Sequence, residues 1–163
     1  MQPSRTASPS RIRLAVCGAL LLLYTAVVLT ITMWPTQPDQ SFGAAVERIL
    51  AFLHRNGLPG WFSVTHLEFT ANIAMFVPLG FLLALTLPHR VSWLAVLLVP
   101  AFSAAIELTQ GQYLPQRFAT VSDVIANKIG GYLGAVLAAG VRAVVHERDR
   151  LVVARALEAA SAR

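Results

Sequence analysis

The distribution of charge along the chain constrains its fold more than any other feature. Asp, Glu, Lys and Arg are absent from three long stretches, Leu14–Pro38, Phe69–His89 and Val91–Ile106. A fourth stretch, Val124–Val141, contains a single charged residue, Lys128. Because a helix needs about 20 apolar residues to cross a hydrocarbon core about 30 Å thick, the four blocks predict an all-α polytopic membrane protein with four transmembrane helices.

The composition agrees with this fold class and excludes others. Of the 163 residues, 56% are apolar and 13% are charged, against about 25% charged in an average soluble domain. These values exclude an intrinsically disordered chain and disfavour a soluble globule, whose single core could not bury so many apolar side chains. The net charge is +5, but no array of interleaved aromatic and basic residues indicates a nucleic-acid partner. Cys17 is the only cysteine, so no intramolecular disulfide can form.

We expect the whole chain, 1–163, to form a single integral membrane domain. The predicted spans cover approximately residues 12–34, 68–87, 91–110 and 121–145, and a basic tail follows at 146–163. The first span is expected to be an uncleaved anchor rather than a signal peptide. Its apolar run is longer than a typical signal core, and Trp34-Pro35 follows it in place of a small-residue cleavage site.

The basic residues predict the orientation of the spans. If the N-terminus is inside, nine arginines lie in inner segments and three in outer segments. The inner ones are Arg5, Arg11, Arg13, Arg90, Arg142, Arg148, Arg150, Arg155 and Arg163, and the outer ones are Arg48, Arg55 and Arg117. Because cytoplasmic loops are enriched in Lys and Arg, both termini are expected to be cytoplasmic.

The outer loop between the first two spans contains a periodic apolar pattern. Its apolar residues at helical spacing are Phe42, Val46, Ile49, Leu50 and Leu53. Charged residues interleave with them, so the loop is predicted to form a short amphipathic helix on the outer membrane surface.

Polar residues gather at the outer ends of the last three spans. They are Asn72, Glu107, Gln110, Arg117, Asp123 and Asn127. Successive spans alternate in direction, so these residues share one level, within about 10 Å of the outer interface at 1.5 Å rise per residue. Ionisable groups inside a membrane usually mark functional sites. The turn between the third and fourth spans can bring Arg117 near Glu107 and Asp123, and a guanidinium between the two carboxylates would keep both ionised.

Other interpretations of these residues remain open. The acids and Arg117 could form a structural ion network, and the amides could form interhelical hydrogen bonds. Lys128 is one residue away from the Asn127 face and could extend to the interface. A metal site built from His66, Glu68, Glu107 and Asp123 has no supporting ligand spacing. No motif indicates a metal or a cofactor, so we expect neither, and no catalytic residue is assigned.

Three blocks of this sequence resemble those of VanZ-like membrane proteins. The first, N-x-x-x-F-x-P-x-G, corresponds to Asn72, Phe76, Pro78 and Gly80. The second, I-E-x-x-Q, corresponds to Ile106, Glu107 and Gln110. The third corresponds to Arg117, Asp123, Asn127, Gly130 and Gly134. The blocks occur in order on three consecutive spans, and the resemblance covers residues 68–138.

The resemblance implies a small helical protein of the bacterial cytoplasmic membrane. The family is named for a member linked to low-level resistance to the glycopeptide teicoplanin. We therefore expect the outer polar residues to engage a membrane lipid, a lipid-linked cell-wall precursor or a glycopeptide. Two alternatives remain. One is a small intramembrane enzyme acting on a lipid head group, and the other is a structural subunit. Whichever alternative holds, we expect helix packing to be the role of Phe76, Pro78, Gly80, Gly130 and Gly134, and the Gly130/Gly134 face could join copies of the chain.

Overall fold

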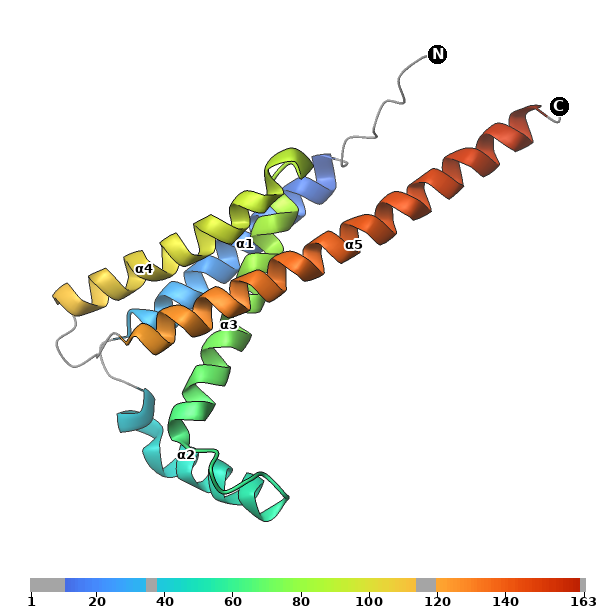
Figure 1. Ribbon diagram of the computed structural model, residues 1–163. Coiled ribbons are helices and arrows are strands. Elements are labelled where there is room, and N and C mark those ends of the chain that lie inside the picture. Colours follow the sequence, from blue (N-terminus) through green and yellow to red (C-terminus); the bar gives the residue numbers. More distant parts are fainter. Residues whose placement is uncertain (1–10, 35–37, 114–119, 162–163) are drawn as a thin grey trace.

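The computed structural model describes residues 11–34, 38–113 and 120–161, and these residues fold into helices without a strand (Figure 1). The elements in chain order are α1 (Arg11–Thr32), α2 (Pro38–Arg55), α3 (Val64–Thr86), the 3₁₀ helix η1 (His89–Leu94), α4 (Ala95–Tyr113) and α5 (Val121–Ser161). Four segments are long and apolar enough to cross a membrane: α1, α3, η1 with α4, and α5. The fold class predicted from the charge-free blocks is therefore confirmed.

The limits of the helices differ from the predicted spans in informative ways. α3 begins at Val64, four residues before the predicted span, because Ser63 and His66 cap its first turn: the Ser63 N–H donates to His66 Nδ1 at 3.2 Å. The third span opens with the 3₁₀ turn η1 and extends to Tyr113. α3 and α4 continue through Pro78 and Pro100, as membrane helices often do.

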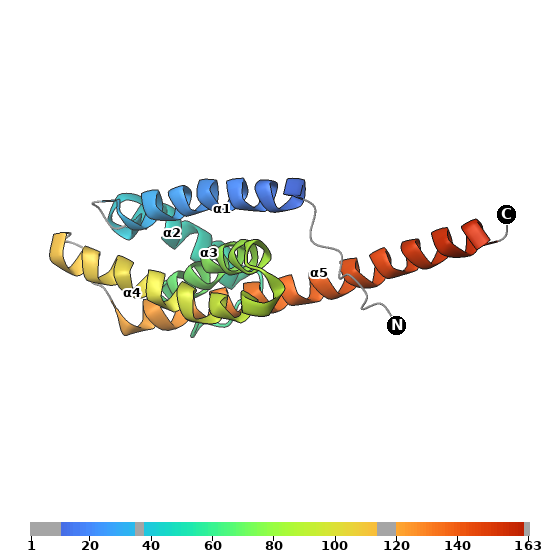
Figure 2. The same ribbon diagram turned by 90° about the horizontal axis from the view of Figure 1, so that it is seen from above.

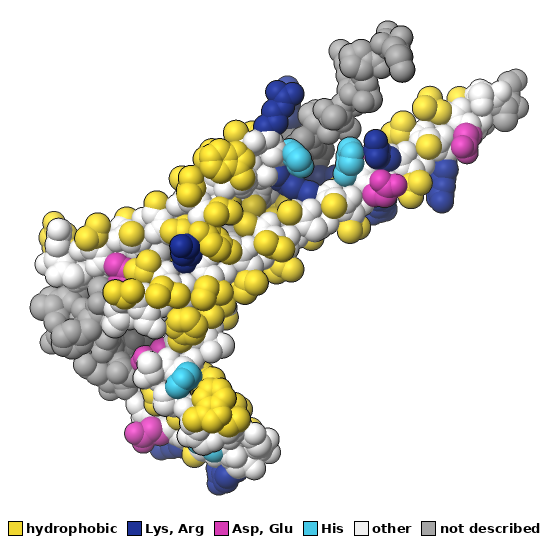
Figure 3. Space-filling model, viewed as in Figure 1, with side chains coloured by type: hydrophobic (Ala, Val, Ile, Leu, Met, Phe, Trp, Pro, Cys, Tyr) yellow, Lys and Arg dark blue, Asp and Glu magenta, His cyan; other side chains and the backbone are white. Residues whose placement is uncertain are grey.

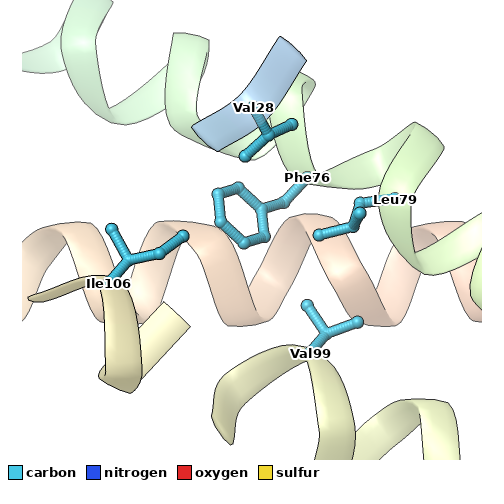
Figure 4. Close-up of a cluster of buried hydrophobic side chains, with 5 residues drawn as sticks. All are labelled: Val28, Phe76, Leu79, Val99 and Ile106. Atoms are coloured by element: carbon cyan, nitrogen blue, oxygen red, sulfur yellow. The ribbon is translucent and has the colours of Figure 1, made fainter. Parts of the chain in front are cut away.

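The helix α3 holds the bundle together. α1, α4 and α5 run in similar directions, and α3 crosses them and packs against all three (Figures 1 and 2). Five buried side chains form the main apolar cluster, and they point toward one another in Figure 4. They are Val28 of α1, Phe76 and Leu79 of α3, and Val99 and Ile106 of α4.

Much of the outer surface is apolar. Leu22 of α1, Leu108 of α4 and Val136 of α5 are each more than 65% exposed. Hydrophobic side chains cover most of the helical face drawn in Figure 3. An apolar surface this extensive is unfavourable in water and suits contact with lipid acyl chains.

Glycines bring the backbones of α3 and α5 into direct contact. A Cβ atom on Gly134 would collide with the Val77 carbonyl oxygen and the Phe81 backbone nitrogen. A Cβ on Gly130 would collide with the Ile73 carbonyl oxygen, and Gly80 faces Gly131 in the same way. The Gly130/Gly134 face is thus covered by α3 of the same chain, and we do not retain it as a surface for oligomerisation.

Two further elements extend beyond the bundle. The amphipathic helix predicted in the first loop is present as α2, which lies beside the start of α3 (Figure 1). At the other end, α5 continues without a break through the tail to Ser161, well past the other helices (Figure 2). Arg13 of α1 lies 3.7 Å from Asp149 of this extension, and both side chains are exposed.

The glycine contact makes a prediction about stability. Gly134→Leu should force α3 and α5 apart and lower the thermal unfolding temperature in detergent, because the new side chain meets backbone atoms that cannot move aside. The cost should reach or exceed the roughly 1–3 kcal/mol typical of overpacked cores. Gly140→Leu on the same helix is the matched control, since a Cβ there meets nothing within 4 Å. Equal losses in both variants would contradict this interpretation.

Candidate functional site

Five of the six predicted polar site residues lie at one end of the bundle. We call this group the polar layer: Asn72 of α3, Glu107 and Gln110 of α4, and Asp123 and Asn127 of α5. The sixth, Arg117, lies outside the described residues. α4 ends and α5 begins at this level, so the polar residues of these two helices lie at the same end of the bundle.

Asp123 is held at the start of α5 by two side chains. Asn72 Nδ2 donates a hydrogen bond to Asp123 Oδ1 at 2.7 Å, and Thr120 Oγ1 donates to Asp123 Oδ2 at 2.8 Å. The Asp123 backbone N–H in turn donates to Thr120 Oγ1 at 3.2 Å, so Thr120 caps the helix. A carboxylate in the first turn is also favoured by the helix dipole. Asp123 therefore joins α3 to α5 and has both oxygens engaged.

Asn127 lies one turn deeper and is almost fully buried. Its side chain, 4% exposed, donates from Nδ2 to Oγ of Ser103, which is 0% exposed, at 2.9 Å. Asn127 Oδ1 is also buried and makes no hydrogen bond within the described part of the chain. Reversing the amide would leave Nδ2 without a partner instead. A buried polar atom in this state costs about 1–3 kcal/mol, so a bound water or ligand that donates a hydrogen bond fits this position.

Gln110 connects α4 to α1. Its Nε2 donates to the Thr32 carbonyl oxygen at 2.7 Å, and the Gln110 side chain is buried. Thr32 is the last residue of α1, where carbonyl oxygens lack partners within the helix. The bond therefore satisfies a helix end. Glu107 is half-buried one turn away, on the same face of α4.

Three members of this network were not among the predicted site residues: Ser103, Thr120 and Thr32. Two of them leave a signal in the sequence. Ser103, Glu107 and Gln110 follow the i, i+4, i+7 spacing of one helix face. Thr120 precedes Asp123 by three residues, which is the spacing of a capping box. Thr32 leaves none, because its carbonyl oxygen, rather than its side chain, binds Gln110.

His66 and Glu68 were considered as metal ligands together with Glu107 and Asp123, but the described residues do not form such a site. The His66 ring caps the start of α3 and lies beside the rings of Trp61 and Phe62. In the part of the chain that the structure describes, no three His, Cys, Asp or Glu side chains gather as metal ligands would. The polar layer instead offers amide, hydroxyl and carboxylate groups.

Arg142 lies at the opposite end of α3. From the sequence it was predicted only to contribute to the orientation of the chain in the membrane. Its Nη2 donates to the Leu85 carbonyl oxygen at 2.9 Å and to the Leu87 carbonyl oxygen at 2.6 Å. Basic side chains favour such positions because the last carbonyl groups of a helix lack partners. In the sequence, Arg142 follows a stretch of 17 residues, 125–141, in which Lys128 is the only charged residue. This isolated position is the signal that could have singled out Arg142.

The four spanning helices, their glycine contacts and the polar layer define an integral membrane protein of helical type. A sequence model of the family VanZ/LLP1 matches residues 19–143, and the chain therefore belongs to the VanZ/LLP1 family. The match confirms the resemblance drawn from the three blocks. It also extends beyond them to most of α1 and to Arg142. The chain matches none of the curated proteins and none of the solved structures.

The contact between Asn72 and Asp123 predicts an energetic coupling. In a double-mutant cycle, Asn72→Ala and Asp123→Ala should couple by about 0.6–1.7 kcal/mol, the range measured for interhelical hydrogen bonds in membranes. Unfolding in mixed detergent micelles measures the four free energies. The pair Asn72→Ala and Ser103→Ala, whose side chains do not bond to each other, should be additive. A coupling as large in this control pair would show that the cycle reports a general loosening of the bundle.

Proposed function

We propose that the polar layer binds a ligand at the outer face of the bacterial cytoplasmic membrane. The ligand would be a membrane lipid, a lipid-linked cell-wall precursor or a glycopeptide. The observation that carries this proposal is Asn127 Oδ1, a buried acceptor without a hydrogen-bond donor among the described residues. Hydrogen bonds between helices account for Asn72, Gln110 and Asp123 without a ligand. They do not account for this oxygen.

The chemistry of the layer indicates a ligand rich in hydrogen-bond donors. Asn127 Oδ1 and the half-buried Glu107 side chain lie on neighbouring helices, and both can accept hydrogen bonds. Peptide amides, sugar hydroxyls and ammonium groups donate such bonds, and cell-wall precursors and glycopeptides carry them in abundance. Arg117, if it reaches the layer, would supply a forked donor for an anionic group.

The proposed orientation places the polar layer on the outer side. The starts of α1 and η1 and the second half of α5 lie at the end of the bundle away from the polar layer (Figures 1 and 2). These segments carry most of the arginines counted as cytoplasmic, among them Arg11, Arg90 and Arg148. A bias of this kind favours a cytoplasmic location for that end.

Cysteine labelling tests the orientation. In a Cys17→Ala background, a cysteine introduced by Ala44→Cys in α2 should react with a membrane-impermeant maleimide in intact cells. One introduced by Arg90→Cys in η1 should react only after the cells are opened. Ala44 and Arg90 are both exposed, so burial does not limit either reaction. The reverse pattern would place the polar layer on the cytoplasmic side and overturn the proposed location.

Teicoplanin susceptibility tests the proposed ligand site. A sensitive Gram-positive host expressing the wild-type chain should tolerate more teicoplanin than the host alone. Glu107→Gln, Arg117→Ala and Asn127→Leu should each remove most of this tolerance at equal abundance in the membrane. Asn127→Leu removes the buried acceptor together with the hydrogen bond to Ser103, so its loss of tolerance is compared with that of Ser103→Ala, which removes the hydrogen bond alone.

The matched control is Thr109→Ala, an exposed position on the lipid-facing side of α4 whose hydroxyl bonds only within its own helix. This variant should retain the tolerance. Loss of tolerance in Glu107→Gln but not in Arg117→Ala or Asn127→Leu would favour the enzyme alternative, because a glutamine side chain cannot transfer a proton. If Asn127→Leu retains the tolerance in full, the polar layer is not the binding site. If the wild type confers no tolerance, a glycopeptide-related role is excluded and lipid binding is tested next.

A further inference from the structure

An apolar groove lies at the end of the bundle opposite the polar layer. It has a volume of about 440 Å³ and runs between the η1–α4 segment and α5. Its apolar lining includes Trp93, Val96, Tyr132, Val136 and Ala139, and Arg142 lies in its wall. The groove is separate from the proposed outer site, so an inference drawn from it stands independently.

Arg142 is held rigidly in this groove and has capacity left to bind. Its Nη2 is engaged by the carbonyl oxygens of Leu85 and Leu87. Its Nη1 is buried and has no hydrogen-bond partner among residues 11–34, 38–113 and 120–161. Capping of α3 therefore uses one nitrogen of the guanidinium and leaves the other as a donor. The remaining Nη1 can donate a charge-assisted hydrogen bond to a phosphate oxygen.

The length of the groove matches one leaflet of a bilayer. Tyr132 and Arg142 are ten residues apart on α5, which is about 15 Å along a helix axis. This is about half of a 30 Å hydrocarbon core. Arg142 would then lie near the head groups and Tyr132 near the middle of the membrane. Trp93, 59% exposed, flanks the head-group end, where tryptophan is enriched in membrane proteins.

The surroundings of Arg142 favour an anion. His89 and Arg90 of η1 are exposed, and so is His146, one turn after Arg142 on α5. Figure 3 shows basic and histidine side chains where this end of the bundle faces α5. The acids that follow Arg142 on α5 lie near other arginines: Asp149 lies 3.7 Å from Arg13, and Glu147 lies 4.0 Å from Arg150. Basic pockets between membrane helices are known to select anionic head groups.

We propose that this groove holds one anionic phospholipid of the adjoining leaflet. The lipid phosphate accepts hydrogen bonds from Arg142 Nη1, and one acyl chain occupies the apolar groove along α5. The lipid completes the hydrogen bonding of the guanidinium and covers the space between α4 and α5. If the proposed orientation is correct, this is the cytoplasmic leaflet.

Native mass spectrometry of the purified full-length chain, titrated with phosphatidylglycerol in detergent, tests the proposal. The wild type should bind one phosphatidylglycerol more tightly than phosphatidylethanolamine. Arg142→Gln should weaken this binding about tenfold or more, as expected for the loss of a charge-assisted hydrogen bond. Ala139→Phe should weaken it similarly by filling the groove. The substitution changes an exposed residue of the groove that takes no part in the hydrogen bonds between Arg142 and α3.

Two control variants separate this site from general lipid contact. Arg148→Gln removes an exposed arginine farther along α5, and Leu133→Phe enlarges an exposed side chain outside the groove. Both should bind like the wild type. If Arg142→Gln fails to fold, Ala139→Phe decides. Unchanged binding in Ala139→Phe, equal binding of the two lipids, or a dimer that Ala139→Phe dissociates would overturn the proposal.

Discussion

The close approach of α3 and α5 is the contact on which the other features depend. Lipid tails are as apolar as leucine, so burial of apolar side chains adds little to helix association in a membrane. Close packing and hydrogen bonds must supply it. Gly130 and Gly134 let the α3 backbone lie directly on α5. This contact fixes the register that brings Asn72 to Asp123 at one end and Arg142 to the last carbonyl groups of α3 at the other.

α4 and α1 join this pair through fewer but equally specific contacts. Val99 packs where a side chain on Gly131 would stand, and one turn farther Ser103 meets Asn127. Gln110 then reaches the end of α1. The polar layer thus links four helices, which makes a structural role certain for most of its members. The proposed ligand role rests on Asn127 Oδ1, a buried acceptor for which the described residues supply no donor.

The sequence predicts the helices and the level of the polar residues, but not their pairing. The charge-free blocks and the glycine spacing are properties of short stretches of sequence. The sequence alone therefore predicts the spans and the Gly130/Gly134 face. The partners Ser103 and Thr120 depend on the register between helices. The predicted tail shows a different difficulty, which is to locate the end of a helix. Charged residues end the membrane-facing surface after residue 145. No glycine or proline follows to end the helix itself, and α5 continues to Ser161.

The two ends of the bundle differ in chemistry in a way that follows from the cost of charge in a membrane. Carboxylates and amides occupy one end, where hydrogen bonds from Asn72 and Thr120 hold Asp123. The other end has Arg142, bound to backbone oxygens that can only accept. The two ends are separated by the apolar middle of α3. A donor-rich ligand fits the first end and a phosphate fits the second. Exchanging these ligands would place like charges together in a medium that screens them poorly.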